Sequence, residues 1–156
     1  MRYLIFLLML AGCASSPKFD TSQVYQSLTP QAVNAEPQES KGKSVLWGGT
    51  ILDTRNLEDS TQIELLAYPL NSSQRPIQSS KPLGRFIVRQ AGYLEPTTYA
   101  QGRLLTVLGS VGDSQPGKVG AANYTYPVIL ADKIQLWSPE SEGSNSTFHF
   151  GIGIGF

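Results

Sequence analysis

The sequence has few of the residues that hydrolysis, metal binding and disulfide formation require. Its 156 residues include one cysteine and one histidine. Cys13 lies near the N-terminus and His149 near the C-terminus, so neither a Ser-His-Asp nor a Cys-His catalytic arrangement is expected. A zinc site would lack soft ligands, and a single cysteine closes no internal disulfide. These scarcities point away from a nucleophilic hydrolase, a zinc protein and a disulfide-stabilised domain.

The chain also lacks an excess of charge of either sign. Twelve basic residues balance twelve acidic ones. A nucleic-acid-binding domain usually carries a basic patch and a high isoelectric point, so nucleic acid is not an expected partner. The length suits one domain with one core and a tail.

The N-terminus carries a targeting signal. After Arg2, an unbroken apolar run extends from Tyr3 to Leu10, which is too short to span a bilayer, where about 20 residues are needed. Such a segment is typical of a secretory signal. The following Leu-Ala-Gly-Cys, which ends at Cys13, resembles the lipobox of bacterial lipoproteins. A plain signal peptide with a chance cysteine, or a buried N-terminal helix, is the alternative.

The lipobox resemblance implies cleavage after residue 12 and lipidation of Cys13. A diacylglycerol on its sulfur and an acyl chain on its new N-terminus would hold the protein on a membrane, because two or more chains anchor stably. No other cofactor is expected. Ala14 and Ser15 follow, without the aspartate that signals inner-membrane retention in Gram-negative lipoproteins, so the outer membrane is favoured.

The rest of the chain divides into three parts. Residues 13–43 are rich in Ser, Pro, Gln and Glu with few bulky apolar side chains, which predicts a flexible tether with at most one short docked turn around residues 25–28. Residues 44–138 have a β pattern. Residues 139–156 are a linker and an apolar, β-prone tail.

Five segments of the β region read as strands: 45–57, 61–70, 84–90, 102–112 and 126–137. Alternation of apolar and polar residues within them predicts which side chains face the core. The predicted core positions are Ile63, Leu65 and Ala67 in the second segment, Leu105, Val107, Gly109 and Val111 in the fourth, and Tyr126, Val128, Leu130, Ile134 and Leu136 in the fifth.

The order of these elements predicts an all-β, five-stranded Greek-key barrel of the OB type. Helix signal is scarce, and residues 93–102 are expected to form a short helical turn between the third and fourth strands. Gly48 and Gly49 suit a sharp bend that lets one strand serve both sides of a small barrel. The glycine-rich stretch 109–120 lacks the Gly-Lys-Ser/Thr end of a phosphate loop and is expected to form a long hairpin. A generic meander or sandwich is the alternative fold.

These residues support a family resemblance. The stretches "VLWGGTILDTRNLEDSTQIELLAYPL", "LGRFIVRQAGYLEPTTYAQGRLLTVLGSV" and "YPVILADKIQLW", behind the lipobox, closely resemble the Slp family of outer-membrane lipoproteins. The resemblance implies an OB-like domain and a starvation- or stationary-phase-inducible envelope protein. It brings no catalytic residue, cofactor or defined ligand with it.

In an OB barrel, ligands bind to the face of the second and third strands and to two loops. Interleaved cations and aromatics on that face could stack bases or sugars, although the balanced charge and the envelope location argue against nucleic acid. An envelope protein, a peptide or a glycan therefore remains as the partner, and ordinary surface charges and core aromatics are the alternative interpretation. The candidate binding face comprises Trp47, Arg55, Tyr68, Arg85, Arg89, Lys118 and Tyr124.

Two further hypotheses come from the carboxylates and from the end of the chain. A carboxylate-based envelope hydrolase would use Asp53, Glu58, Asp59 or Glu64, but Glu58 and Asp59 are expected in an exposed turn. The closing "FHFGIGIGF", residues 148–156, has one wholly apolar face. It could add a strand to the domain, dock on a membrane surface or partner, or join an oligomeric barrel; a docking tail is favoured.

The sequence thus predicts an outer-membrane lipoprotein whose barrel faces the periplasm as a non-catalytic binding or structural module for envelope maintenance under starvation or stress. An accessory of an envelope export or assembly machine, docked through its C-terminal strand, is the second hypothesis. The carboxylate hydrolase is the third. The ligand, the partner and the oligomeric state stay open.

Overall fold

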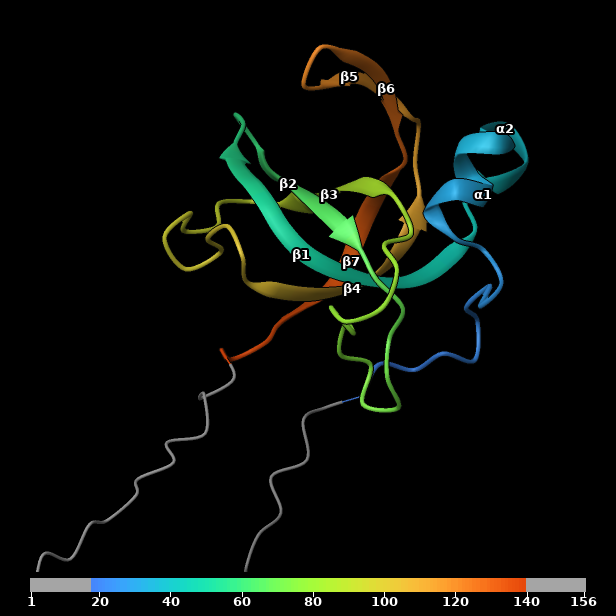
Figure 1. The fold of residues 1–156 in the computed structure, drawn as a ribbon, viewed down its shortest axis with the longest axis horizontal. Helices are drawn as coiled ribbons and strands as arrows, with labels where there is room; N and C mark the ends of the chain where they lie inside the picture. The colour runs from blue at the N-terminus through green and yellow to red at the C-terminus, as the bar shows by residue number, and fades with distance from the viewer. Residues whose placement is uncertain (1–17, 140–156) are drawn as a thin grey trace, which may run out of the picture.

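The computed structural model describes residues 18–139, which form a closed β-barrel (Figure 1). The barrel order is β1-β2-β3-β7-β4; all neighbours are antiparallel except β3 and β7, which are parallel. A separate antiparallel ribbon, β5-β6, joins β4 to β7. The elements are α1 (Pro30–Ala35), α2 (Pro37–Ser40), β1 (Ser44–Asn56), β2 (Ser60–Ala67), β3 (Arg85–Ala91), β4 (Leu104–Val111), β5 (Gln115–Val119), β6 (Ala122–Tyr126) and β7 (Val128–Leu136).

The predicted fold class is confirmed. Each of the five predicted segments overlaps one barrel strand, and the order of pairing is that of a small Greek-key barrel. The hairpin expected after the fourth strand is the β5-β6 ribbon, which stands away from the barrel (Figure 1).

The glycine pair lets β1 serve both sides of the barrel. Residues 44–50 pair with β4, residues 49–56 pair with β2, and Gly49 and Thr50 belong to both ladders. A Cβ on Gly49 would lie 2.1 Å from the carbonyl oxygen of Leu66, and one on Gly48 would lie 2.8 Å from the carbonyl oxygen of Leu105. Only glycine permits this close approach of neighbouring strands.

The core follows the predicted faces of β2 and β4, whereas the predicted face of the fifth segment is divided. Tyr126 and Val128 are buried in a second, smaller cluster, and Ile134 and Leu136 pack against the main core. Ile63 and Leu65, like Leu105 and Val107, are fully buried. Leu130, which was also expected in the core, is 45% exposed, and Ile129 is buried in its place. The β4-β7 register shifts where Ala131 and Lys133 pair with consecutive residues of β4. The extra residue between them switches the inward-facing positions from odd to even numbers, so simple alternation fails.

The described part of the predicted tether is packed against the barrel, so the prediction of a flexible segment up to residue 43 is wrong from residue 18 onward. The two helices of the structure lie here, before β1, and Val33 of α1 is fully buried in the main core. The amide of Tyr25 donates to the carbonyl of Ser44 over 2.9 Å. A few apolar side chains are enough because the barrel already supplies the surface that they cover.

The helical turn expected at residues 93–102 is much shorter. The amides of Thr98 and Tyr99 both donate to the carbonyl of Glu95, at 3.0 Å each, and no helix forms around this single turn. The segment is held instead by side chains, since Asn56 donates to the carbonyl of Leu94. Specific contacts with the barrel replace the helix here.

Both ends of the described chain leave from the same side of the barrel, away from the β5-β6 ribbon (Figure 1). Two neighbouring residues of one loop hold them. The backbone of Phe19 forms two hydrogen bonds with the side-chain amide of Gln74, and the Arg75 guanidinium donates to the carbonyl of Ser138. No helix within residues 18–139 is long and apolar enough to cross a membrane.

Candidate functional site

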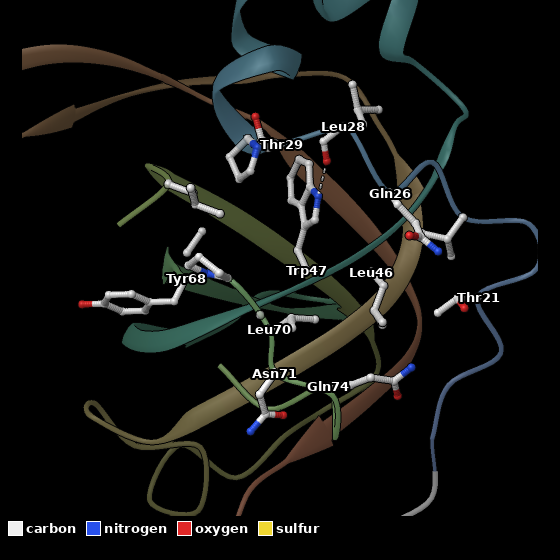
Figure 2. A pocket seen from close by; sticks show the side chains of 16 residues that line it. Thr21, Gln26, Leu28, Thr29, Leu46, Trp47, Tyr68, Leu70, Asn71 and Gln74 are labelled. Atoms are coloured by element: carbon white, nitrogen blue, oxygen red, sulfur yellow. Dashed lines mark hydrogen bonds between the residues drawn. The ribbon is translucent and has the colours of Figure 1, made fainter. Parts of the chain in front are cut away.

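A cavity of about 480 Å³ lies between the N-terminal segment, the start of β1 and the loop after β2 (Figure 2). This volume falls within the range of small-molecule sites, roughly 300–1,000 Å³. The name "strap cavity" is used for it below, because residues 21–30 run along one side of it as a strap. Its lining residues are Thr21, Val24, Gln26, Leu28, Thr29, Pro30, Leu46, Trp47, Gly48, Ala67, Tyr68, Pro69, Leu70, Asn71, Gln74 and Leu83.

Trp47 connects the strap to the barrel. It is 7% exposed, and its ring packs edge-on against Phe86 with centroids 5.2 Å apart. Its indole N–H donates to the carbonyl of Leu28 over 2.7 Å (Figure 2). A buried indole needs such an acceptor, and a turn between Tyr25 and Leu28 presents it. Because its N–H is already satisfied, Trp47 serves as a wall of the cavity rather than as a free hydrogen-bond donor.

The opposite wall is the loop after β2, which is fixed by its own hydrogen bonds. The side-chain oxygen of Asn71 accepts from the amides of Ser73 and Arg75, as asparagine commonly does in turns. A bridge between Leu70 and Pro76 closes the loop. The carbonyl of Gln74 accepts from the buried hydroxyl of Thr106 on β4. The wall therefore has a defined shape that the barrel maintains.

The strap cavity is uncharged. None of the 16 residues that line it is Asp, Glu, Lys or Arg. Several of its polar side chains are engaged with the protein's own backbone: Thr29 caps α1 through the amide of Ala32, and Gln74 holds Phe19. The rest of the lining combines the aliphatic side chains of Val24, Leu28, Leu46, Leu70 and Leu83 with the neutral polar side chains of Thr21, Gln26 and Tyr68.

The predicted binding face is not one surface, because its seven residues lie in three places. Trp47 and Tyr68 line the strap cavity, although the Tyr68 ring points away from Trp47 (Figure 2). Arg55 lies on an exposed part of β1, with its guanidinium 3.3 Å from the carboxylate of Asp53. The remaining four, Arg85, Arg89, Lys118 and Tyr124, lie where β3 meets the β5-β6 ribbon.

Where β3 meets the ribbon, charged side chains bond one another and a tyrosine. Arg85 and Glu64 form an ion pair at 2.9 Å, and the Tyr126 hydroxyl donates to the same carboxylate oxygen over 3.0 Å. Burial and this hydrogen bond to a carboxylate raise the pKa of Tyr126 above its ordinary value of 10.0. The ring of Tyr124 packs on that of Tyr126, and its hydroxyl accepts from the amide of Arg85.

Arg89 extends the same network. Its guanidinium donates to the side-chain oxygen of Gln115 on β5 over 3.0 Å. Lys118 is exposed, and its carbonyl accepts from the Tyr126 hydroxyl. Arg85, Arg89 and Tyr124, which resemble part of an OB ligand face in the sequence, therefore attach the ribbon to β3.

Two of the four carboxylates considered for catalysis are engaged in ion pairs. Asp53 and Glu64 are opposite each other on β1 and β2, but each is paired with its own arginine, Arg55 or Arg85. Glu58 and Asp59 are exposed between the two strands. Within residues 18–139, no three His, Cys, Asp or Glu side chains are grouped so that they could hold a metal ion.

Sequence reasoning missed most of the strap cavity. Val24 and Leu28 were recognisable only as rare apolar residues in a polar segment, which is the signal that could have revealed a docked strap. Leu70 and Leu83 both lie in the loop between β2 and β3, where no periodicity applies. Cys13 and the tail at residues 148–156 lie outside the described residues, so lipidation and docking stay predictions.

Fold and site together define a small OB-like β-barrel domain with a side cavity bounded on one side by its own N-terminal segment. The barrel order and the uncharged lining carry this description.

Comparison with known proteins assigns the family. The model of the outer membrane lipoprotein Slp family matches residues 10–152, most of the chain. The chain belongs to the outer membrane lipoprotein Slp family and is an outer-membrane lipoprotein. Membership implies association with the membrane through a lipid anchor.

Three relatives are similar over most of the chain. An uncharacterized protein of Haemophilus influenzae is 34% identical over 83% of this chain and 70% of its own length. The uncharacterized lipoprotein YeaY of Escherichia coli is 30% identical (85% and 68%), and the outer membrane protein Slp of the same organism is 28% identical (83% and 69%). A solved structure, Schizosaccharomyces pombe Pot1pC bound to ssDNA, aligns over 79% of this chain and 91% of its own at 13% identity; its TM-score of 0.29 carries no inference.

Proposed function

We propose that this lipoprotein is a non-catalytic binding module of the outer membrane, with its barrel in the periplasm. The observation that carries the proposal is the strap cavity, which is uncharged and is bounded on one side by the segment that follows the anchor. A diacylglycerol and an N-acyl chain on Cys13, after loss of residues 1–12, would hold it there. A role in envelope maintenance under starvation or stress agrees with the family resemblance.

The described residues support binding rather than catalysis. A hydrolase needs a nucleophile, a base and a charge stabiliser brought together. Here Glu64 is committed to Arg85 and Tyr126, and Asp53 to Arg55. These carboxylates are structural partners, which leaves the proposed carboxylate hydrolase without a free acid or base at this face.

Replacement of Cys13 by Ser tests the anchor. The variant should move from the outer-membrane fraction to the soluble periplasmic fraction, because no acyl chain remains to partition into lipid. Protease added to intact cells should leave the barrel uncut, and protease added after the outer membrane is opened should cut it. Continued membrane association of the variant would overturn the proposed anchor. Cleavage of the barrel in intact cells would overturn the proposed periplasmic orientation.

A further inference from the structure

The strap cavity has properties that narrow the class of ligand. Its lining has no side chain that could neutralise a phosphate, a carboxylate or an amine, since it includes no Asp, Glu, Lys or Arg. A charged group would lose its hydration there without compensation. The part of a ligand that enters must therefore be neutral and largely apolar.

The barrel itself argues against a peptide strand as the ligand. A peptide that binds by strand addition needs a free sheet edge, and the described barrel is closed through β4 and β1. A sugar would need an open aromatic face beside its hydrogen-bond donors. The ring of Trp47 packs edge-on against Phe86 with its N–H bonded to Leu28, and the Tyr68 ring points away from it (Figure 2).

The cavity is also close in the sequence to Cys13, the expected site of the lipid anchor. Thr21, its lining residue nearest to the N-terminus, is eight residues after Cys13 in the sequence. Eight fully extended residues span at most about 28 Å. Phe19, which precedes the strap, is fixed to the barrel by its two hydrogen bonds with Gln74. A lipidated Cys13 would keep the cavity within reach of the bilayer surface.

We propose that the strap cavity binds one acyl chain of a membrane glycerophospholipid. Leu28 and Val24 of the strap would cover one side of the chain, and Leu46 and Leu70 would cover the other. The headgroup stays outside, because the lining offers it no charged partner. This inference rests on the proposed function, since it requires the lipid anchor to bring the cavity to the membrane.

Photocrosslinking tests the proposal. The full lipidated protein is placed in vesicles of phosphatidylethanolamine and phosphatidylglycerol that contain a trace of phosphatidylethanolamine with a diazirine in one acyl chain. After irradiation, mass spectrometry should find the label on peptides that carry residues 21–30 and 67–83. Label only at apolar residues that are exposed elsewhere, such as Leu57 or Leu130, would overturn the proposal.

Filling the cavity should remove the label. Val24→Trp fills it from the strap and Leu70→Trp from the opposite wall, so the two variants change different elements. Both should lose most of the label, while Leu57→Trp, at a position that is 44% exposed outside the cavity, should keep it. Near-ultraviolet circular dichroism checks that each variant is folded. Full labelling of either folded cavity variant contradicts the proposal.

A second arm distinguishes a membrane lipid from the protein's own acyl chains. The mature chain with Cys13→Ser carries no lipid, and a diazirine-bearing fatty acid in solution is its probe. Labelling of the cavity in this variant and also in the lipidated protein supports the proposal. Labelling of the variant alone means that a chain on Cys13 fills the cavity of the lipidated protein and overturns it. Because this arm needs no anchor, it distinguishes failure of the cavity from failure of the proposed localisation.

Discussion

Two regions of this barrel differ in how they use polar groups. At the ribbon face, between β3 and β5-β6, long polar side chains bond one another across strands: Arg85 to Glu64, and Arg89 to Gln115. At the strap cavity, Thr29 and Gln74 bond the backbone, and aliphatic side chains make up much of the lining. The first region is rich in the residue types associated with binding, yet it serves as structure. The second has few of them and is where space remains.

The contrast shows that residue type alone is a poor guide to a binding surface. A guanidinium is available to a ligand only if the protein does not already satisfy it, and ion pairs between strands satisfy it at little cost. An apolar cavity needs no distinctive residue, only space that remains between the barrel and the strap. The predictions below test whether the strap depends on packing and the ribbon on charge.

The largest effect is expected from Trp47→Ala, which removes the link between strap and barrel. The variant loses the contact with Phe86 and the hydrogen bond to Leu28. The free energy of unfolding should fall by about 3–5 kcal/mol, the usual cost of truncating a buried large aromatic. Urea denaturation measures it. Tyr93→Ala, at a position that is 69% exposed, should change stability by at most about 0.5 kcal/mol; equal effects would contradict the assignment of Trp47 to the core.

A smaller effect is expected where the ribbon meets β3. Glu64→Gln removes the charge that accepts from Arg85 and Tyr126. Hydrogen bonds to charged groups contribute more than neutral ones, so the loss should be about 1–3 kcal/mol. Asp53→Asn is the matched control across the strand pair, because its ion pair with Arg55 is largely exposed and should contribute at most about 1 kcal/mol. A larger loss from Asp53→Asn would reverse this ranking.

The sequence predicts the barrel well, because alternation is a local property. The positions of β2 and β4 follow from every second residue being apolar, and the glycine pair in β1 marks the bend. The failure at Leu130 has a different origin: the bulge after Ala131 depends on how β7 meets β4. A pattern within one strand carries no information about that register.

The site was harder to predict because its parts are distant in the sequence. Val24, Trp47 and Leu70 meet only after the barrel closes. The cations Arg85 and Arg89 were expected on a ligand-binding face, whereas in the structure they bond Glu64 on β2 and Gln115 on β5. Sequence spacing shows which groups are present, whereas tertiary pairing decides which remain available.

The strap can also be tested at its C-terminal end, where α1 begins. The hydroxyl oxygen of Thr29 accepts from the amide of Ala32 over 3.2 Å and caps this six-residue helix. Thr29→Ala should destabilise the protein by about 1 kcal/mol, as loss of an N-cap commonly does. Hydrogen exchange should accelerate at Val33 before it accelerates in β2. Thr29→Ser retains a capping hydroxyl and should restore the slow exchange; failure to do so would show that the methyl group, not the cap, holds the strap.

The smallest effect is expected to depend on pH and to be confined to the ribbon. Folding raises the pKa of Tyr126 above 10.0 through burial and the hydrogen bond to Glu64, so the folded protein holds this proton more tightly than the unfolded chain. The resulting stability is fully present below pH 10.0 and is lost as the pH rises through the raised folded pKa. Denaturation at pH 8 and at pH 11 gives the loss of unfolding free energy between these two pH values. This loss is compared between the wild-type protein and Tyr126→Phe. The wild-type protein should lose more stability than the variant, which has no phenol here to ionise. An equal loss in both would mean that the ribbon contact does not distinguish the protonated phenol from the phenolate, and the contrast between a charge-dependent ribbon and a packing-dependent strap would then rest on Glu64 and Arg85 alone.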